Sequence, residues 1–253
     1  MNREATGLAG ARHKHYETLG STNAEALALA RAGECGPLWL TAAAQTAGRG
    51  RRGAVWVSKP GNLYATLLLT DPAPPAQAPQ LSFVAALALH DAVAQCAPQL
   101  GPALKVKWPN DLLLGDAKVA GILIEGESGP ALAVAVGIGV NCAHHPDATA
   151  YPATDLAAAG ALVTPENMLE ALAGAMARRL AQWARGAGFA AIRTDWLKRA
   201  AGLGQEVRVR LPEREFSGLF QGLDDAGRLL VAQAGVVTPV TAGEVFGFGS
   251  VQS

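Results

Sequence analysis

Cysteine is scarce in this sequence: the 253 residues contain three, Cys35, Cys96 and Cys142, which lie far apart. Their number is odd and their spacing fits no metal site, so the pattern excludes a disulfide framework and indicates free thiols in a reducing compartment, the cytoplasm. Charged residues make up 17% of the chain, and 21 basic residues balance 21 acidic ones. This zero net charge offers no overall attraction for nucleic acid.

Long apolar runs are also missing, because the most hydrophobic stretches are interrupted by His90 and Asp91 or by Glu125 and Glu127. No segment is therefore expected to span a bilayer, and the first residues lack the apolar centre of a signal peptide. Half of the residues are nevertheless hydrophobic, which allows a chain of this length to bury a full core. We expect a globular cytoplasmic protein that binds neither membranes nor nucleic acid.

Hydrophobic periodicity predicts a first domain of mixed helices and strands. Helices are expected at residues 22–33, 80–95, 165–185 and 189–200, and strands at 37–45, 62–70, 104–108, 119–125 and 131–140. Thr22 and Glu25 have the spacing of a capping box at the first helix. The Pro-rich residues 71–79 are expected to form an irregular loop. About fifteen residues precede this domain, too few for a DNA-binding module.

The pattern changes after Gly202, where short strands alternate with turn signals such as Asp225-Ala226-Gly227. This spacing predicts a small all-β barrel. The expected fold class is therefore α+β, with one domain over residues 1–201 and a second over residues 202–253.

Residues 48–53, GRGRRG, match the glycine pattern of a dinucleotide-binding loop. That motif requires a helix directly after it, whereas Pro60-Gly61 and β-forming residues follow here. The phosphate-binding loop of common ATPases is absent as well. The glycines permit close approach of the backbone to a ligand, and the arginines supply positive charge that suits carboxylate or phosphate. Together they favour a loop that clamps an anion and is mobile without it. An ordinary solvated loop is the alternative.

A second polar cluster, Lys107-Trp108-Pro109-Asn110-Asp111, ends a predicted strand. Pro109 stops strand pairing, so Asn110 and Asp111 are expected to project from a rigid turn, where they can orient a polar substrate or hold Mg²⁺. Lys118 enters the next apolar strand and is expected to meet an anion. The alternative for Lys118 is a strand-end residue that reaches into water.

In this order the segments resemble the catalytic domain of biotin protein ligases. The matching residues are Ser21 to Asn23, Gln45, 48–53, Trp56, Asn62 to Tyr64, Lys107 to Asp111, Lys118 to Leu123, Gly137 to Asn141, and Gly243-Glu244. The resemblance covers nearly the whole chain and implies an SH3-like C-terminal barrel. It also implies an enzyme that uses ATP to convert biotin to its adenylate and transfers biotin to a carrier-protein lysine.

The resemblance assigns roles to individual residues. Biotin would contact Ser21, Thr22, Asn23, Gln45, Gly48, Arg49, Arg51, Lys118 and Gly121. ATP and the adenylate would contact Arg49, Arg51, Arg52, Trp56, Asn110, Lys118 and Asn141, although a core position for Trp56 is equally compatible with the sequence. Lys118, Arg51 and Asp111 would be the catalytic residues. Asp111 is open to two roles, base or Mg²⁺ ligand.

The implied partner is the biotin carboxyl carrier protein of acetyl-CoA carboxylase. Since the signature begins at Ser21, the chain resembles the non-regulatory form, without a DNA-binding repressor module. The rival functions are a lipoate ligase or octanoyl transferase of the same fold and a biotin-binding protein without activity. Monomer and homodimer both stay open. His144 and His145, adjacent in a polar loop, are expected to be surface residues rather than metal ligands.

Overall fold

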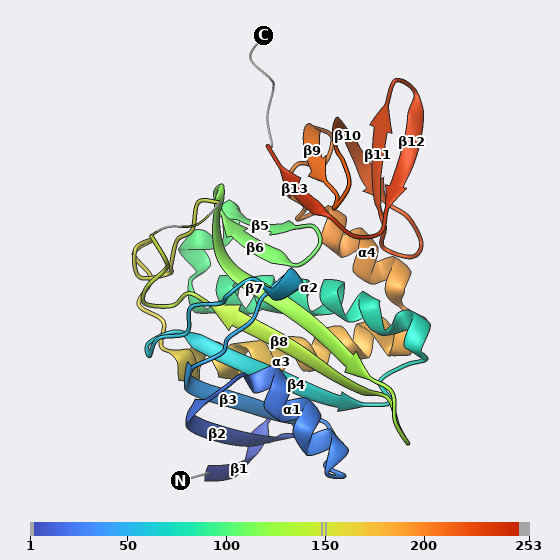
Figure 1. Cartoon of the computed structure of the whole chain (residues 1–253). Coiled ribbons are helices and arrows are strands. Elements are labelled where there is room, and N and C mark those ends of the chain that lie inside the picture. Colours follow the sequence, from blue (N-terminus) through green and yellow to red (C-terminus); the bar gives the residue numbers. More distant parts are fainter. Residues whose placement is uncertain (1–2, 148, 150, 248–253) are drawn as a thin grey trace.

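The computed structural model describes residues 3–147, 149 and 151–247. Within them, an eight-stranded sheet has the order β1-β2-β3-β4-β8-β7-β6-β5 (Figure 1). Strands β2 and β3 pair in parallel, and the other neighbours in the sheet pair antiparallel. The strands are β1 Arg3–Leu8, β2 Ala11–Leu19, β3 Leu38–Gln45, β4 Leu63–Thr70, β5 Leu104–Lys107, β6 Asp111–Leu114, β7 Ala117–Glu127 and β8 Ala133–Val140.

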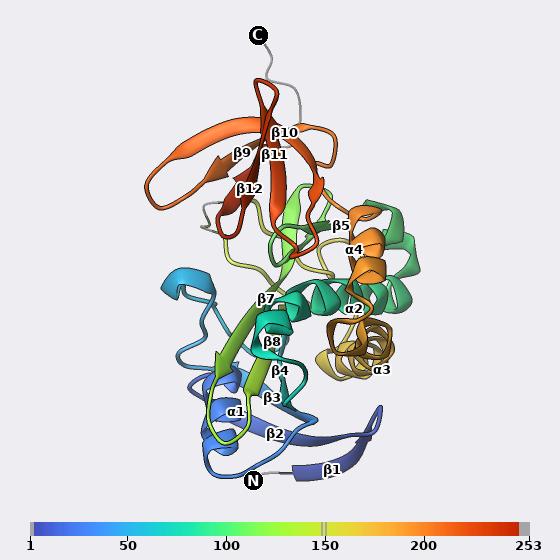
Figure 2. The same cartoon turned by 90° about the vertical axis from the view of Figure 1, so that its right-hand side faces the viewer.

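Helices cover both faces of this sheet. Figure 2 shows α1 on one side and α2 and α3 on the other. The helices are α1 Thr22–Arg31, α2 Leu81–Cys96, α3 Pro165–Trp183 and α4 Phe189–Leu197. Local signals explain the start of α3, because the Thr164 side chain accepts a hydrogen bond from the Asn167 amide and Pro165 occupies the first helical position.

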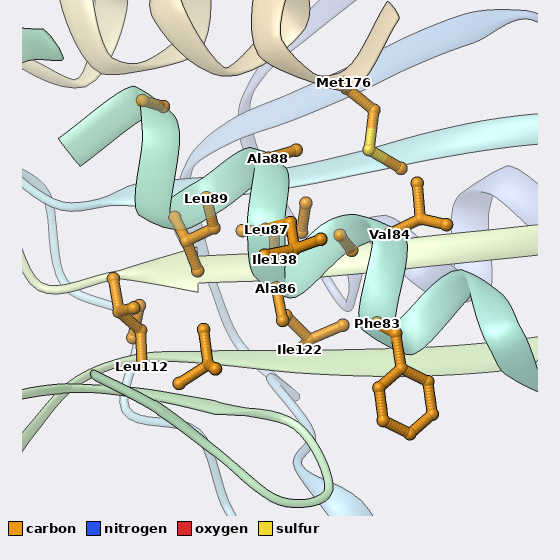
Figure 3. Packing of buried hydrophobic residues seen from close by; sticks show 14 of the residues in the cluster. Phe83, Val84, Ala86, Leu87, Ala88, Leu89, Leu112, Ile122, Ile138 and Met176 are labelled. Carbon is orange, nitrogen blue, oxygen red and sulfur yellow. The ribbon is translucent and has the colours of Figure 1, made fainter. Parts of the chain in front are cut away.

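Helix α2 is the centre of the main core. Its residues 83–89 are all buried, which is expected of a helix enclosed by the sheet on one side and by other helices on the other. Figure 3 shows Phe83, Leu87 and Leu89 of α2 beside Ile122 of β7 and Ile138 of β8. The sheet is therefore fixed against α2 through one face of β7 and β8.

The C-terminal part forms a five-stranded antiparallel sheet in the order β12-β11-β10-β9-β13. Its strands are β9 Glu206–Arg210, β10 Glu215–Leu223, β11 Leu229–Gln233, β12 Val236–Val240 and β13 Glu244–Phe246. The Trp108 indole donates to the carbonyl of Gly227 at 3.3 Å, and buried residues of this sheet belong to the same hydrophobic cluster as α2. The two parts thus share one core, and the fold class predicted from the sequence is confirmed.

Three local predictions were wrong. Residues 3–19 form β1 and β2 of the main sheet instead of preceding the domain. Residues 75–80, expected in an irregular loop, form a 3-10 helix. The capping box is absent, because Ser21 is the N-cap residue and its side chain makes no capping hydrogen bond. Thr22 instead directs its hydroxyl to Gln45 Oε1 at 3.2 Å. The hairpin strand β6 was not predicted at all.

No helix in the described residues is long and apolar enough to cross a membrane.

We expect Leu89→Ala to lower the free energy of unfolding by about 2–5 kcal/mol, because it removes a fully buried side chain between α2 and the sheet. Urea unfolding followed by circular dichroism measures this. Leu162→Ala is the control, since Leu162 is 91% exposed and its truncation should change stability by less than about 0.5 kcal/mol. Equal effects of the two substitutions would contradict this description of the core.

Candidate active site

A cavity of about 490 Å³ lies against β7 and β8, between the Gly/Arg loop (residues 48–57) and β13. Most residues predicted for the site line it. They are Ser21, Thr22, Asn23, Gln45, Arg49, Arg51, Trp56, Asn110, Asp111, Lys118, Gly121 and Asn141. The structure therefore brings together segments that are up to 120 residues apart in the sequence, and two predicted residues, Gly48 and Arg52, lie outside the lining.

One end of the cavity is neutral and rich in hydrogen-bonding groups. Gln45 Oε1 accepts from the Thr22 amide at 2.8 Å, and Gln45 Nε2 donates to Ser58 Oγ at 2.9 Å. These bonds fix the orientation of the Gln45 amide. Ser21 is buried and its hydroxyl is not used by the helix. Hydroxyl and amide groups held in this way suit a buried polar but uncharged ligand group.

Asn23 is fixed at the same end by three neighbours. Its Nδ2 donates to the Leu123 carbonyl at 3.1 Å and to Glu125 Oε2 at 2.8 Å. Thr66, which is fully buried, lies 2.7 Å from Asn23 Oδ1. Gly137 on β8 faces this amide so closely that an added Cβ would overlap it. With its amide engaged on both sides, Asn23 supports the shape of the site.

Two glycines form the floor of the cavity beneath Trp56. Gly121 on β7 pairs directly with Gly139 on β8. A Cβ on Gly139 would lie 2.6 Å from the Trp56 ring, and one on Gly121 would lie 3.0 Å from it. Trp56 Nε1 is buried and has no hydrogen-bond partner among the described residues. The sequence left two positions open for Trp56, and the structure places it in the cavity lining rather than in the hydrophobic core.

The Gly/Arg loop folds back on itself instead of opening a helix. Trp56 N donates to the Gly48 carbonyl at 3.0 Å, and Arg49 forms a bridge with Val55. Gly48 lies against the Trp56 carbonyl and Ser58 Oγ, where a Cβ would overlap. Since no α-helix follows the motif, it lacks the architecture of a dinucleotide-binding loop. Arg52 is exposed, with φ at +54°.

The other two arginines of the loop turn toward the cavity. Arg49 Nη2 lies 3.2 Å from Glu125 Oε1. Arg51 Nη1 donates to the Gly243 carbonyl at 3.3 Å and lies 3.5 Å from Asn110 Oδ1. Burial is the main factor that lowers the pKa of Arg51, although a guanidinium stays protonated in proteins. Its two hydrogen-bond partners are neutral, and the carboxylates of Asp111 and Glu244 are the acidic groups that act on its charge.

Lys118 and Asp111 meet at the centre of the site. Lys118 Nζ lies 2.6 Å from Asp111 Oδ1, and both side chains are largely shielded from solvent. This oxygen nevertheless has no hydrogen-bond partner among the described residues, so the contact is a close charge pair without hydrogen-bond geometry. Lys118 Nζ also lies 5.3 Å from the Trp56 ring centroid. The anion that the sequence predicted for Lys118 is, within the protein itself, Asp111.

Three further side chains, Lys107, Tyr151 and Glu244, line the cavity near the C-terminal sheet. The sequence interpretation gave them no role in the site. Lys107 Nζ lies 4.8 Å above the Tyr151 ring, and burial lowers the pKa of Lys107. The Tyr151 hydroxyl donates to Glu244 Oε2 at 3.0 Å. Burial, followed by the neighbouring Glu244 carboxylate, raises the pKa of Tyr151 to about 12, so the phenol is a stable donor at neutral pH.

The loop after β8 is held by Asn62 and Asn141. Asn62 Oδ1 accepts from the amides of Cys142 and Ala143, both at 2.9 Å. Asn141 Nδ2 donates to the Thr154 carbonyl at 2.9 Å. The adjacent histidines serve the same loop: Asn62 Nδ2 donates to the His144 carbonyl at 2.8 Å, and His145 Nδ1 lies 2.6 Å from Asp155 Oδ2.

The described residues contain no group of three or more His, Cys, Asp or Glu side chains arranged for a metal ion. Asp111 Oδ1 lies 2.6 Å from Lys118 Nζ, and Asn110 lines the same cavity. A Mg²⁺ ion is usually held by one or two carboxylates together with substrate phosphates and water. Asp111 and Asn110 therefore fit an ion that enters with ATP, and they do not form a complete protein cage.

Sequence reasoning missed Thr66 and Ser58, which support the polar end, and gave no role to Tyr151. A signal existed for Thr66 alone, because a hydroxyl residue in the apolar run of β4 needs a partner when buried. The contact of Tyr151 with Glu244 joins residues 93 positions apart and could not be predicted from local pattern.

Residues 33–141 match the biotin/lipoate A/B protein ligase family, and residues 202–246 match the biotin protein ligase C-terminal domain. A biotin–[acetyl-CoA-carboxylase] ligase of Paracoccus denitrificans is 48% identical over 236 residues, which cover 89% of this chain and 96% of that protein. The biotin–[acetyl-CoA-carboxylase] ligase of Mycobacterium tuberculosis is 33% identical over 89% of this chain and 85% of its own length.

Solved structures agree with these matches. Biotin protein ligase from Aquifex aeolicus, in complex with biotin and ATP, superposes with a TM-score of 0.76 at 26% identity, over 92% of this chain and 97% of that one. The Leishmania major enzyme in complex with biotinyl-5-AMP gives a TM-score of 0.64 at 25% identity, over 91% and 98% of the two chains. This chain belongs to the biotin protein ligase family.

Proposed function

We propose that the protein activates biotin with ATP and then transfers it to a lysine of the biotin carboxyl carrier protein of acetyl-CoA carboxylase. One observation carries the proposal: a single cavity joins a neutral hydrogen-bonding end to a cationic end. The neutral end has Ser21, Thr22 and Gln45, which suit the ureido ring of biotin. The cationic end has three basic residues, Arg51, Lys107 and Lys118, against two acidic ones, Asp111 and Glu244, a net charge of +1. Arg49 is paired with Glu125 beside Asn23.

In the first half-reaction, a carboxylate oxygen of biotin attacks the α-phosphorus of ATP, and the bond between that phosphorus and the pyrophosphate oxygen breaks. Two anions must approach each other, so positioning and charge stabilisation dominate the catalysis. Lys118, at the junction of the two ends, would bridge the biotin carboxylate and the α-phosphate. Arg51 would lie over the adenylate phosphate, and the Mg²⁺ held near Asp111 would neutralise phosphate charge.

In the second half-reaction, the ε-amine of the carrier lysine attacks the acyl carbon of the mixed anhydride. The new C–N bond replaces the bond from acyl carbon to phosphate oxygen, and AMP leaves as the anion. The amine must lose a proton, and Asp111 is the carboxylate placed beside Lys118 to accept it. Its position 2.6 Å from Lys118 Nζ supports this role, while its alternative role beside Mg²⁺ belongs to the first half-reaction.

The mixed anhydride must also be kept from water, and the Gly/Arg loop is suited to cover it. The loop contributes Arg49, Arg51 and Trp56 to the cavity, and its exposed tip contains Val55, which is 82% exposed. A loop with few buried contacts opens at low energetic cost. Binding of an anion to its arginines would favour the closed state and exclude water from the reacting centre.

Pyrophosphate–ATP exchange on the purified protein tests the proposed function. With biotin as the added acid we expect Mg²⁺-dependent exchange, because adenylation is reversible while pyrophosphate is present. Lipoate and octanoate should support no exchange above background. Exchange with lipoate or octanoate alone would assign the protein to the lipoyl enzymes, and binding of biotin without any exchange would indicate a protein that only binds it.

Gly139→Ala should weaken biotin binding at least tenfold, equivalent to about 1.4 kcal/mol, because its Cβ would lie 2.6 Å from the Trp56 ring and displace it. Isothermal titration calorimetry with biotin measures the change. Gly126→Ala is the matched control: this glycine is also on β7–β8, and its Cβ would meet the Ala133 carbonyl at an ordinary 3.8 Å. Wild-type affinity in the Gly139 variant would refute the proposed glycine floor.

Arg51→Ala should raise the release rate of biotinyl-adenylate at least tenfold, because it removes the cation placed for the adenylate phosphate. Its effect on folding should be near the value of one hydrogen bond, about 1 kcal/mol, from the lost contact with Gly243. Stopped-flow release and thermal unfolding measure the two quantities, with Arg178→Ala, an exposed position on α3, as control. An unchanged release rate would remove Arg51 from the mechanism.

A further inference from the structure

A second cavity of about 210 Å³ adjoins the first and shares four lining residues with it, Lys107, Asp111, Lys118 and Tyr151. Its remaining lining is Leu113, Asp116, Pro152, Phe246 and Gly247. The cavity therefore reaches the Lys118–Asp111 pair from the side of the C-terminal sheet. The neutral hydrogen-bonding end described above lies in the first cavity alone, so the reacting centre has access from two directions.

The walls of this second cavity suit an aliphatic chain. Leu113 and Pro152 contribute apolar surface, and the ring of Phe246 stacks on Tyr151 with centroids 4.9 Å apart. These aromatic rings already have cations near their faces, since Lys107 Nζ lies 4.8 Å from the Tyr151 centroid and the Arg210 guanidinium 4.5 Å from that of Phe246. Because aromatic faces attract cations and these two are already occupied, the rings offer apolar surface to the methylene chain rather than a site for its ammonium group.

The charges of the cavity do not favour pyrophosphate, the polyanion released in the first half-reaction. Two lysines are balanced by two aspartates, Asp111 and Asp116, and this neutral sum offers no net attraction for a polyanion. Asp116 is exposed in the turn between β6 and β7, whereas Asp111 is partly buried beside Lys118. The exposed Asp116 carboxylate attracts an approaching ammonium group, and Asp111 provides a second carboxylate beside the reacting centre.

We propose that this second cavity is the channel through which the acceptor lysine of the carrier protein reaches the adenylate. The assignment rests on the proposed function and extends it to the path of the second substrate. Asp116 attracts the protonated amine, and the walls formed by Tyr151, Pro152 and Phe246 hold its methylene chain. There the amine, deprotonated as in the proposed second half-reaction, attacks the acyl carbon, the bond from that carbon to the phosphate oxygen breaks, and AMP leaves.

Two variants test the channel in different ways. Asp116→Arg reverses the charge at an exposed position. Pro152→Phe places an aromatic side chain in the channel. It keeps the backbone carbonyl of residue 152, which accepts a hydrogen bond from the Lys118 amide at 2.8 Å. Each variant is assayed for biotin-dependent pyrophosphate exchange and for single-turnover transfer from preformed adenylate to the biotin carboxyl carrier domain. We expect the ratio of transfer rate to exchange rate to fall about tenfold in both.

Glu17→Arg is the matched control for charge reversal, because Glu17 is an exposed carboxylate on β2 and lines neither cavity. It should leave the ratio unchanged. The loss in Asp116→Arg should also diminish as salt is added, since it arises from an exposed charge, whereas the steric loss in Pro152→Phe should not. Thermal unfolding confirms that each variant is folded.

The outcomes separate the two proposals. Absence of biotin-dependent exchange in the wild-type protein would overturn the proposed function itself. Exchange and transfer at wild-type rates in both variants would leave that function intact and overturn the channel. An equal loss of exchange and transfer in both variants would also overturn it, because the two positions would then serve adenylation rather than entry of the lysine.

Discussion

The site depends on a constraint on two neighbouring strands, β7 and β8. One face of the pair must have glycine where the ligand lies, and the other face must have apolar side chains. Gly121 faces Gly139 across the pair, and the next pair along, Ile122 and Ile138, points the opposite way into the core beneath α2. Because side chains alternate along a strand, one pair of strands provides both the ligand floor and the wall of the core. Burial of each isoleucine contributes about 1.5–3 kcal/mol, which offsets the cost of strand glycines, about 0.5–1 kcal/mol each.

A neutral protein can bind two anions because its charges are distributed locally. Arg49 is paired with Glu125 and Lys118 with Asp111, so these two cations have anionic partners within the protein. In the proposed mechanism the phosphates and the biotin carboxylate compete with Asp111 for Lys118. Formation of the adenylate thereby loosens the pair and leaves the Asp111 carboxylate beside the reacting centre at the stage when the carrier amine arrives. The same ion pair then links the two half-reactions.

Local patterns were sufficient for much of this structure. The long helix α2, the strands from β3 to β8 except β6, and the change to short strands after Gly202 all follow from periodicity and turn residues. The sequence failed for β2, whose residues RHKHYET carry charged and aromatic side chains without clean alternation. It failed for Thr22 as well, because the hydroxyl that suits a cap is engaged by Gln45, a partner fixed by tertiary structure.

The candidate residues were found by motif, but their arrangement was not. The resemblance assigns phosphate contacts to all three arginines of the loop, whereas backbone geometry turns Arg49 and Arg51 inward and leaves Arg52 exposed. The contact of Arg51 with Gly243 spans 192 positions, and no local pattern contains such information. The glycine requirements at Gly137 and Gly139 become evident only when Asn23 and Trp56 are seen to occupy the space that a Cβ would fill.

The C-terminal sheet is part of the site rather than an appendage. Gly243 accepts from Arg51, Glu244 holds Tyr151, and Phe246 lines the second cavity.

The two half-reactions make opposite demands, since the adenylate must be sealed from water while a lysine on another protein must reach it. A single opening cannot meet both demands well. In the proposed arrangement the Gly/Arg loop seals the first cavity, and β13 together with the loop that carries Tyr151 forms a second passage to the same ion pair. Its lining offers Pro152 and Phe246 to the methylene chain and Asp116 to the ammonium group. The small β-domain thereby takes part in the second half-reaction as well as in the shared core.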